Sequence, residues 1–444
     1  MGAMPVPELL LNMSVPIMVS LLVQSLYNIV DSIFVARISE SALTATTLAY
    51  PVQILMVAVA IGTGSGMASL LSRMLGSGDR RGACMCATTG IMLTVLSAFV
   101  FLLLGIFAVN GFVRLFTDDA ETAQMCVIYL RICMLFGIGT FVEVVVQRIL
   151  QAVGNTFLSM VSLAAGALTN IILDPIFIFG LLGIPAFGIA GAAMATVIGQ
   201  WVGAIVALML NKFRNKDVRF IFRGFRPDMK MIGEIYKVGI PTMVMQGMAS
   251  IMNAAMNAIL ISFSSTAVAF FGVYFKLQNF LYMPINGIGQ AVLPIVGYNY
   301  GGRSKERLAK LLKTAIPATV AIALCGTVLF CTVPGPLLSL FSASEEMLAL
   351  GIPAIRIISL SFAFGGVVVV LGFYAAGLGN GVINMLGTAI RQFIVLIPAV
   401  LIIANTAGIS RIWYAFWISE SAALICTVLM FTHTYKKKLR EISA

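Results

Sequence analysis

The chain has 444 residues, of which 60% are hydrophobic and only 10% are charged, and its mean hydropathy is +1.02. This composition excludes a soluble globular protein, because so few ionic side chains cannot cover a water-exposed surface of that size. The net charge of +11 indicates membrane topology and attraction to anionic lipid, so we expect membrane lipid and no nucleic acid as a partner.

Apolar stretches of about 20 residues or more recur along the whole chain, and they predict an all-α integral membrane protein with twelve transmembrane helices. The spans expected in the first half are 9–36, 44–75, 84–112, 121–148, 157–180 and 188–211. Those expected in the second half are 231–262, 266–299, 309–334, 345–375, 382–404 and 411–434. The predicted organisation is an N-terminal six-helix bundle (1–211), a basic linker (212–230), a C-terminal six-helix bundle (231–435) and a basic tail (436–444).

Basic residues set the expected orientation, because cationic connections are retained on the cytoplasmic side of a membrane. Most of the 28 basic residues fall in the connection between spans two and three, the linker, the connection between spans eight and nine, and the tail. With twelve spans, all four segments lie on one face. We therefore expect a multi-pass protein of the cell membrane with both termini in the cytoplasm.

The second half of the chain repeats the first at a constant offset of 225 residues, without a gap. Proline, asparagine, glutamine and arginine are rare inside membrane spans, so their coincidence is informative. An even number of spans in each half predicts two bundles in the same orientation, related by an axis along the membrane normal, with a cleft between them. The matching pairs include Pro16 and Pro241, Asn28 and Asn253, Gln53 and Gln278, and Arg131 and Arg356.

Two carboxylates break the repeat, since Asp31 and Asp174 correspond to Met256 and Ala399. A carboxylate inside a span costs about 3 kcal/mol or more, which marks it as a functional candidate. Asn170 lies one helical turn before Asp174, and Thr196 in span six adds a hydroxyl. Such oxygen ligands suit Na⁺ or a shared proton. The alternatives are that Asp174 only caps a helix broken at Pro175, and that Asn170 and Thr196 only bond neighbouring helices.

The second half carries other polar residues inside its spans. Lys276, Arg391 and Glu420 lie at similar expected depth, so an Arg391–Glu420 or Lys276–Glu420 pair competes with substrate contact as their role. The 25 methionines and 29 phenylalanines could supply a soft, aromatic cleft wall suited to flat cations. The residues that we expect to face the cleft, with helix packing as the alternative, are Gln246, Asn253, Asn257, Lys276 and Gln278.

Three motifs resemble the multidrug and toxic compound extrusion (MATE) family over essentially the whole chain. They are Asn28-Ile-Val-Asp31 with Pro16 before it, the segment Gln147–Thr156, and Pro294-Ile-Val-Gly-Tyr-Asn299-Tyr-Gly-Gly. The chain is most similar to a bacterial branch with an acidic site in its first bundle. That resemblance implies Asp31 and Asp174 as coupling carboxylates, with Asn170, Thr196 and Tyr129 as hydrogen-bonding partners. The acids that another branch carries in spans seven and ten have no counterpart here, where span seven offers Asn253 and Asn257.

The resemblance implies an antiporter, not an enzyme, that is driven by H⁺ or Na⁺ and exports amphipathic, mostly cationic small molecules. We expect it to act as a monomer with no cofactor besides the coupling ion. A lipid-linked precursor flippase of the same superfamily is the nearest alternative, but such proteins have extra spans or a strongly cationic cavity. An intramembrane enzyme would need a paired-acid Mg²⁺ motif or a nucleophile with its base, and a channel fits poorly with two repeated bundles.

Overall fold

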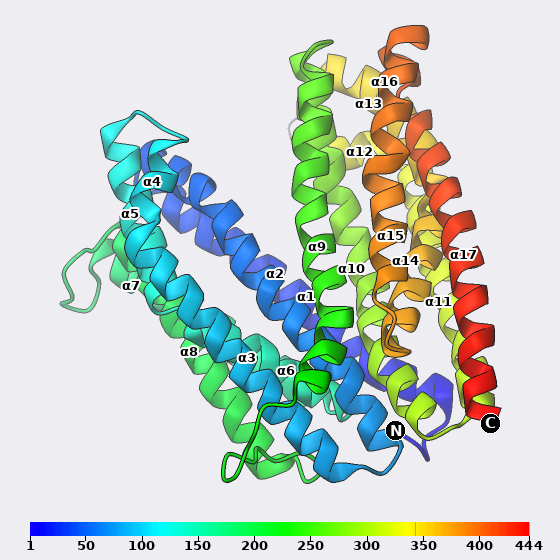
Figure 1. Ribbon diagram of the computed structural model, residues 1–444. Coiled ribbons are helices and arrows are strands. Elements are labelled where there is room, and N and C mark those ends of the chain that lie inside the picture. Colours follow the sequence, from blue (N-terminus) through cyan, green and yellow to red (C-terminus); the bar gives the residue numbers. More distant parts are fainter. Residues whose placement is uncertain (342, 444) are drawn as a thin grey trace. The chain divides into compact units, whose positions relative to one another are not determined.

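The computed structural model describes residues 1–341 and 343–443, and these residues are predominantly helical (Figure 1). Ten of the described helices are long and apolar enough to cross a membrane, and two bent helix pairs raise the number to twelve when each pair counts as one span. The predicted twelve-span, all-α architecture is therefore confirmed.

The first half contains six spans in chain order. The connection between its third and fourth spans carries a short helix, α4 (Val109–Arg114). The spans are α1 (Val6–Ala36), α2 (Glu40–Gly76), α3 (Arg80–Phe107), the pair α5 (Ala120–Leu135) and α6 (Ile138–Ala152), α7 (Thr156–Phe179) and α8 (Ile189–Arg214).

The second half follows the same plan, with a short helix α12 (Pro334–Ser339) at the position equivalent to α4. Its fifth span is interrupted, because a π-helical turn η1 (Ile390–Ile394) separates two α-helical pieces. The spans are α9 (Met229–Leu260), α10 (Ser265–Gly301), α11 (Lys305–Thr332), the pair α13 (Glu345–Ser359) and α14 (Phe362–Gly377), α15 (Val382–Ala389) with η1 and α16 (Leu396–Ala407), and α17 (Tyr414–Ser443), which follows the 3₁₀ turn η2 (Ile409–Arg411).

The offset of 225 residues extends from the sequence to the backbone conformation. The fourth span of each half is bent, by 49° between α5 and α6 and by 48° between α13 and α14. Side chains at equivalent positions begin equivalent helices by accepting a backbone N–H, which satisfies a donor that the first helical turn leaves open. The equivalent caps are Ser39 and Ser264, and Asp119 and Ser344. Equivalent residues with positive φ are Gly78 and Arg303, Gly154 and Gly379, and Gly183 and Gly408.

The chain divides into two compact units. The beginning of each half of the chain belongs to the unit that is formed mainly by the other half. One unit, here called the first-half unit, consists of Val15–Met243, and the other, the second-half unit, consists of Met1–Ser14 and Val244–Ala444. Helices α1 and α9 therefore each contribute to both units. The exchanged stretches of these two helices correspond to one another under the 225-residue repeat.

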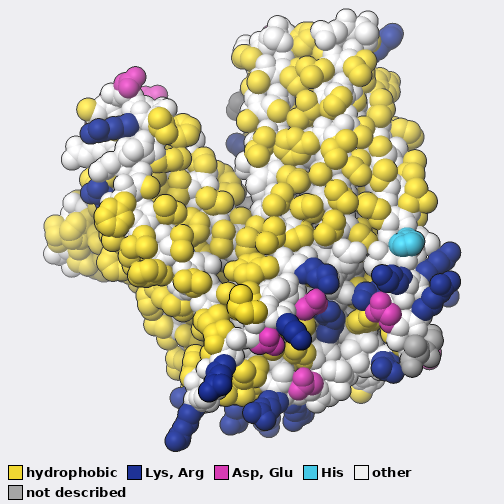
Figure 2. All heavy atoms as spheres, in the orientation of Figure 1, with side chains coloured by type: hydrophobic (Ala, Val, Ile, Leu, Met, Phe, Trp, Pro, Cys, Tyr) yellow, Lys and Arg dark blue, Asp and Glu magenta, His cyan; other side chains and the backbone are white. Residues whose placement is uncertain are grey.

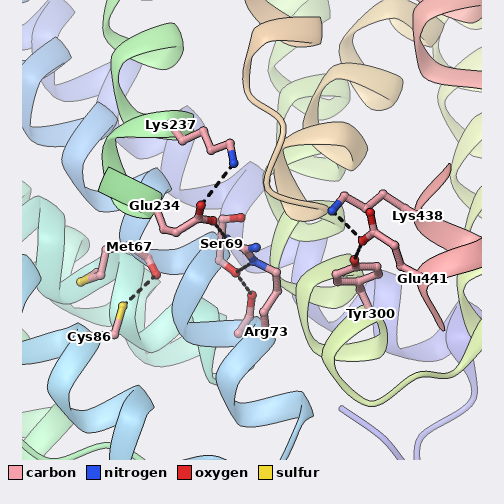
Figure 3. Close-up of polar contacts among 10 residues, drawn as sticks. Met67, Ser69, Arg73, Cys86, Glu234, Lys237, Tyr300, Lys438 and Glu441 are labelled. Carbon is pink, nitrogen blue, oxygen red and sulfur yellow. Dashed lines mark hydrogen bonds and ion pairs between the residues drawn. The ribbon is translucent and has the colours of Figure 1, made fainter. Parts of the chain in front are cut away.

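Polar contacts hold each exchanged stretch. In the second-half unit, the Arg307 guanidinium donates to the carbonyl oxygens of Met1 and Met4, at 2.8 and 2.7 Å. In the first-half unit, Arg73 of α2 lies 3.6 Å from Glu234 of α9, which also pairs with Lys237 (Figure 3). Close packing supports this second contact, because a Cβ added to Gly66 of α2 would lie 2.0 Å from a carbonyl oxygen of α9.

Each unit exposes apolar side chains along its helices, and most of the basic side chains visible in Figure 2 lie at one end, with a few at the other. In the first-half unit, the basic end carries the α8–α9 connection, which α3 holds through an Arg80–Asp217 ion pair of 3.4 Å. In the second-half unit, the basic end carries the end of α17, where Glu441 accepts hydrogen bonds from Lys438 and Tyr300 (Figure 3). An apolar girdle with one basic end is the surface expected of a membrane-embedded bundle.

Candidate functional site

The site predicted in the first half is built where α7 and α8 touch through their backbones. A Cβ added to Gly199 of α8 would lie 2.8 Å from the carbonyl oxygen of Gly166 of α7. A Cβ added to Gly166 would likewise lie 2.8 Å from the carbonyl oxygen of Gly199. Only residues without a side chain permit helices to approach so closely, as is common between membrane helices. This contact brings Asn170 of α7 next to Thr196 of α8.

Asn170 is the centre of this polar group. Its Nδ2 lies 3.4 Å from Asp174 Oδ1 and 3.4 Å from Thr196 Oγ1. Asn170 is 3% exposed and Asp174 is fully buried. The spacing of four residues places the amide and the carboxylate on one face of the helix, as expected from the sequence. The structure thus brings together three of the residues that the sequence singled out.

Asp31 of α1 completes the group, since its carboxyl group lies close enough to that of Asp174 for a hydrogen bond once one of them carries a proton. Two carboxylates in contact repel each other when both are ionised, so the pair favours a bound cation between them. The oxygens Asp31 Oδ1, Asn170 Oδ1 and Asp174 Oδ2 are buried and have no hydrogen-bond partner within the described residues. Three open oxygen acceptors of this kind can hold a proton or coordinate Na⁺.

Tyr129 of α5 lies at the edge of this group. It is buried, and its hydroxyl accepts a hydrogen bond of 3.2 Å from Gln53 Nε2 of α2, so its direct partner is Gln53 and not a carboxylate. The sequence did not single out Gln53 as a site residue. The signal that could have identified Gln53 is an amide side chain inside an expected span, with an amide, Gln278, at the equivalent position of the repeat.

Two further residues near the carboxylates were not assigned to the site from the sequence. Tyr27, one helical turn before Asp31, lies within electrostatic reach of Asp31, Asp174 and Glu143. Glu143 of α6 accepts a hydrogen bond of 3.1 Å from Gln147. A Cβ on Gly203 of α8 would lie 2.3 Å from Glu143 Oε1, so this third acid packs directly against the backbone of α8. The first-half unit therefore carries a larger group of ionisable side chains than the two carboxylates alone.

The residues predicted to face a cleft in the second half separate into two sets. Gln246 and Gln278 line a cavity inside the second-half unit. Asn253 instead donates its amide to Ala249 O of its own helix, at 2.9 Å. Asn257 and Lys276 are exposed, and Lys276 Nζ lies 6.0 Å from the centre of the Phe341 ring. The structure brings only the two glutamines together around one cavity.

Of the ion pairs considered for the second half, the structure shows Arg391 with Glu420. Their Nε and Oε1 atoms are 3.6 Å apart, and both side chains line the same cavity as Gln246 and Gln278. No cluster of three or more histidine, cysteine, aspartate or glutamate side chains suited to a metal ion occurs in residues 1–341 and 343–443.

Comparison with known proteins gives the same organisation in two repeats. The MatE family model matches residues 16–176 and 241–402, two segments that begin 225 residues apart. The chain is 24% identical over 429 residues to the multidrug export protein MepA of Staphylococcus saprophyticus, covering 95% of this chain and 92% of the relative. It is 25% identical over 440 residues to the protein of the same name from Staphylococcus haemolyticus, covering 97% and 94%.

Two solved structures have the same fold. One is a MATE transporter in complex with MaL6, and the other is the outward-facing conformation of a multidrug resistance MATE family transporter of the MOP superfamily. Each superimposes with a TM-score of 0.91 at 25% identity, covering 98% of this chain and 97% of the other. The chain therefore belongs to the MatE family, the multidrug and toxic compound extrusion transporters, and is a multi-pass membrane protein.

Proposed function

We propose that the protein is an antiporter that exports amphipathic small molecules, mostly organic cations, in exchange for H⁺ or Na⁺ bound between Asp31 and Asp174. The observation that carries this proposal is the contact between these two carboxyl groups, with three buried oxygens open, inside an apolar bundle. The relatives named as multidrug export proteins, which match over more than nine-tenths of this chain, support the export of drugs.

The proposed cycle uses the carboxylate pair as a receptor for one cation at a time. When H⁺ or Na⁺ leaves, the exposed negative charge favours a cationic cargo, and when the ion returns, that attraction is lost. Ion and cargo therefore compete for one negative charge. We propose that the two bundles rock between an inward and an outward opening, and that the basic ends of the units face the cytoplasm together with both termini.

The charge balance determines which driving force such an exchanger uses. One entering H⁺ or Na⁺ for one leaving monovalent cation moves no net charge, so the membrane potential, about 2.3 kcal/mol per charge per 100 mV, contributes nothing. Only the ion gradient remains. A tenfold gradient supplies about 1.4 kcal/mol per ion, which sustains a cargo gradient of about tenfold.

Gradient-driven efflux tests this function. Proteoliposomes loaded with a fluorescent organic cation would be given an inward H⁺ gradient, an inward Na⁺ gradient or neither, with equal K⁺ and valinomycin holding the potential at zero. We expect one of the two ion gradients to accelerate efflux, and a potential imposed without an ion gradient to have no effect. Efflux that responds to the potential alone would replace antiport with uniport or another stoichiometry.

A further inference from the structure

The second-half unit contains a cavity that the exchange of one cation does not use. Its volume is about 240 Å³, and its walls come from α9, α10, α14, α15, η1, α16 and α17. One part of the wall is ionic and hydrogen-bonding, with Arg391, Glu420 and Tyr282, and another is apolar, with Phe275, Phe373 and Met245. Sites for small organic molecules combine apolar side chains with convergent polar groups, and the wall of this cavity contains both in similar measure.

The ion pair in this cavity leaves hydrogen-bonding capacity on both partners. The Arg391 and Glu420 side chains are 19% and 7% exposed, and their nearest atoms, at 3.6 Å, are too far apart for a good hydrogen bond. Arg391 Nη1 and Glu420 Oε2 are buried without a hydrogen-bond partner in the described part of the chain. The same holds for the Tyr282 hydroxyl and for Gln392 Oε1, so two donors and two acceptors are open in one place.

Local backbone features place these groups. The π-helical turn η1 contains Arg391 and Gln392, which both line the cavity, and π-helical turns inside α-helices are frequent at functional sites. Gly365 of α14 has no side chain to occupy the space beside Tyr282 and Glu420. A Cβ there would lie 2.3 Å from the Tyr282 hydroxyl and 2.9 Å from Glu420 Oε2. The Arg391 guanidinium also lies 5.6 Å from the centre of the Tyr282 ring.

From this arrangement we infer that the cavity binds the ammonium and carboxylate groups of zwitterionic organic compounds, with Arg391 and Tyr282 holding the carboxylate and Glu420 and Gln392 the ammonium. A compound with a single charge would occupy one partner of the buried pair and leave the other unpaired, which is strongly unfavourable. A bound zwitterion replaces the Arg391–Glu420 ion pair with two ion pairs, one with each residue, so that no buried charge is left unpaired. Uncharged cargo gains no ionic attraction from either residue.

The size of the cavity limits which part of the compound it holds. A volume of about 240 Å³ is below the roughly 300–1,000 Å³ of sites for whole drug-sized ligands. It accommodates a zwitterionic head group, with an apolar remainder against the phenylalanine and methionine side chains. The statement that the protein exports such compounds rests on the proposed export function, and it adds zwitterions to the proposed substrates. Binding to the cavity is independent of transport.

A matched pair of fluorescent compounds tests the inference by equilibrium binding to the purified full-length protein. Nε-dansyl-L-lysine carries an ammonium and a carboxylate, and monodansylcadaverine is the same molecule without the carboxylate. In the double variant Arg391→Gln/Glu420→Gln, we expect the Kd for dansyl-lysine to rise at least about tenfold and that for dansylcadaverine to change less than about twofold. Neutralising both partners together avoids leaving one buried charge alone.

Two further variants keep the test decisive. Tyr282→Phe removes only a hydroxyl and should weaken dansyl-lysine binding about three- to tenfold, even if the double variant does not fold. Arg356→Gln is the matched control, because Arg356 lies in the same unit, donates to Cys331 O and does not line the cavity. It should leave both Kd values unchanged.

The inference is overturned if the wild-type protein does not bind dansyl-lysine, or if the folded double variant and Tyr282→Phe both bind it as the wild type does. Arg391 and Glu420 would then be a structural pair only. The proposed function is tested separately by Asp31→Asn. That variant should lose ion-driven efflux of dansylcadaverine and still bind dansyl-lysine, so failure of one proposal does not imply failure of the other.

Discussion

Asp31→Asn and Asp174→Asn are each expected to reduce ion-driven export at least about tenfold, to the rate of vesicles without protein. Asparagine has the size of aspartate but cannot take up a proton or supply a negative charge, so the remaining carboxylate has no partner with which to share a cation. Because Asp174 is fully buried and Asp31 has a buried, open oxygen, neutral side chains should not impair insertion or folding. Efflux from proteoliposomes and drug resistance in cells lacking other exporters measure the effect.

Asp118→Asn is the matched control for these variants. Asp118 belongs to the same unit, precedes α5 and is exposed, so the same chemical change there should leave export unchanged. Expression and the elution volume of each purified variant report whether the fold is intact. Normal resistance in both Asp31→Asn and Asp174→Asn, at wild-type expression, would remove the coupling site from the first-half unit.

Gly199→Val is expected to destabilise the protein by about 1–3 kcal/mol, as overpacking of a close contact does. The new side chain would lie 2.8 Å from Gly166 O and 3.1 Å from Asn170 Cβ, so α7 and α8 must separate. Separation would stretch the contact of Asn170 with Thr196, which is already 3.4 Å long, and export should fall together with the melting temperature.

The control for this packing change is Gly233→Ala, in the part of α9 that belongs to the first-half unit. A Cβ at Gly233 meets no atom within 4 Å, so alanine should leave export unchanged and stabilise the helix by about 0.5–1 kcal/mol. Thermal unfolding in detergent and efflux are measured for both variants. A Gly199→Val protein that melts and exports like the wild type would show that the α7–α8 approach is not required.

Much of the architecture could be predicted from the sequence, because membrane spans and repeats are properties of sequence order and composition. The twelve spans follow from hydropathy, and the 225-residue offset gives equivalent caps and turns in both halves. The bend in span ten could not be predicted from its own residues, since Leu360 and Ser361 at that bend include neither proline nor glycine, whereas the bend in span four contains Gly137. The exchange of 1–14 and 229–243 between the units also has no signal in local hydropathy.

The candidate sites show the same division between local and long-range information. Asn170 and Asp174 could be paired from the sequence because four residues make one helical turn. The contact of Gln53 with Tyr129 joins residues 76 apart, and no local pattern specifies such a partner. In the second half, the depth of Arg391, Lys276 and Glu420 allowed two different pairs. Only the packing of η1 against α17 selects Arg391, while Lys276 is exposed.

The most direct test of the central claim is whether the coupling ion and a cationic cargo compete at Asp31 and Asp174. Ethidium has a permanent charge, so its binding to the purified protein can be followed by fluorescence across pH and Na⁺ concentration without a change in the ligand. We expect its Kd to rise up to about tenfold for each tenfold rise in either H⁺ or Na⁺ concentration, because mutually exclusive binding is reciprocal. This dependence should disappear in Asp174→Asn. A wild-type Kd that is independent of both ions would contradict coupling through competition at this site.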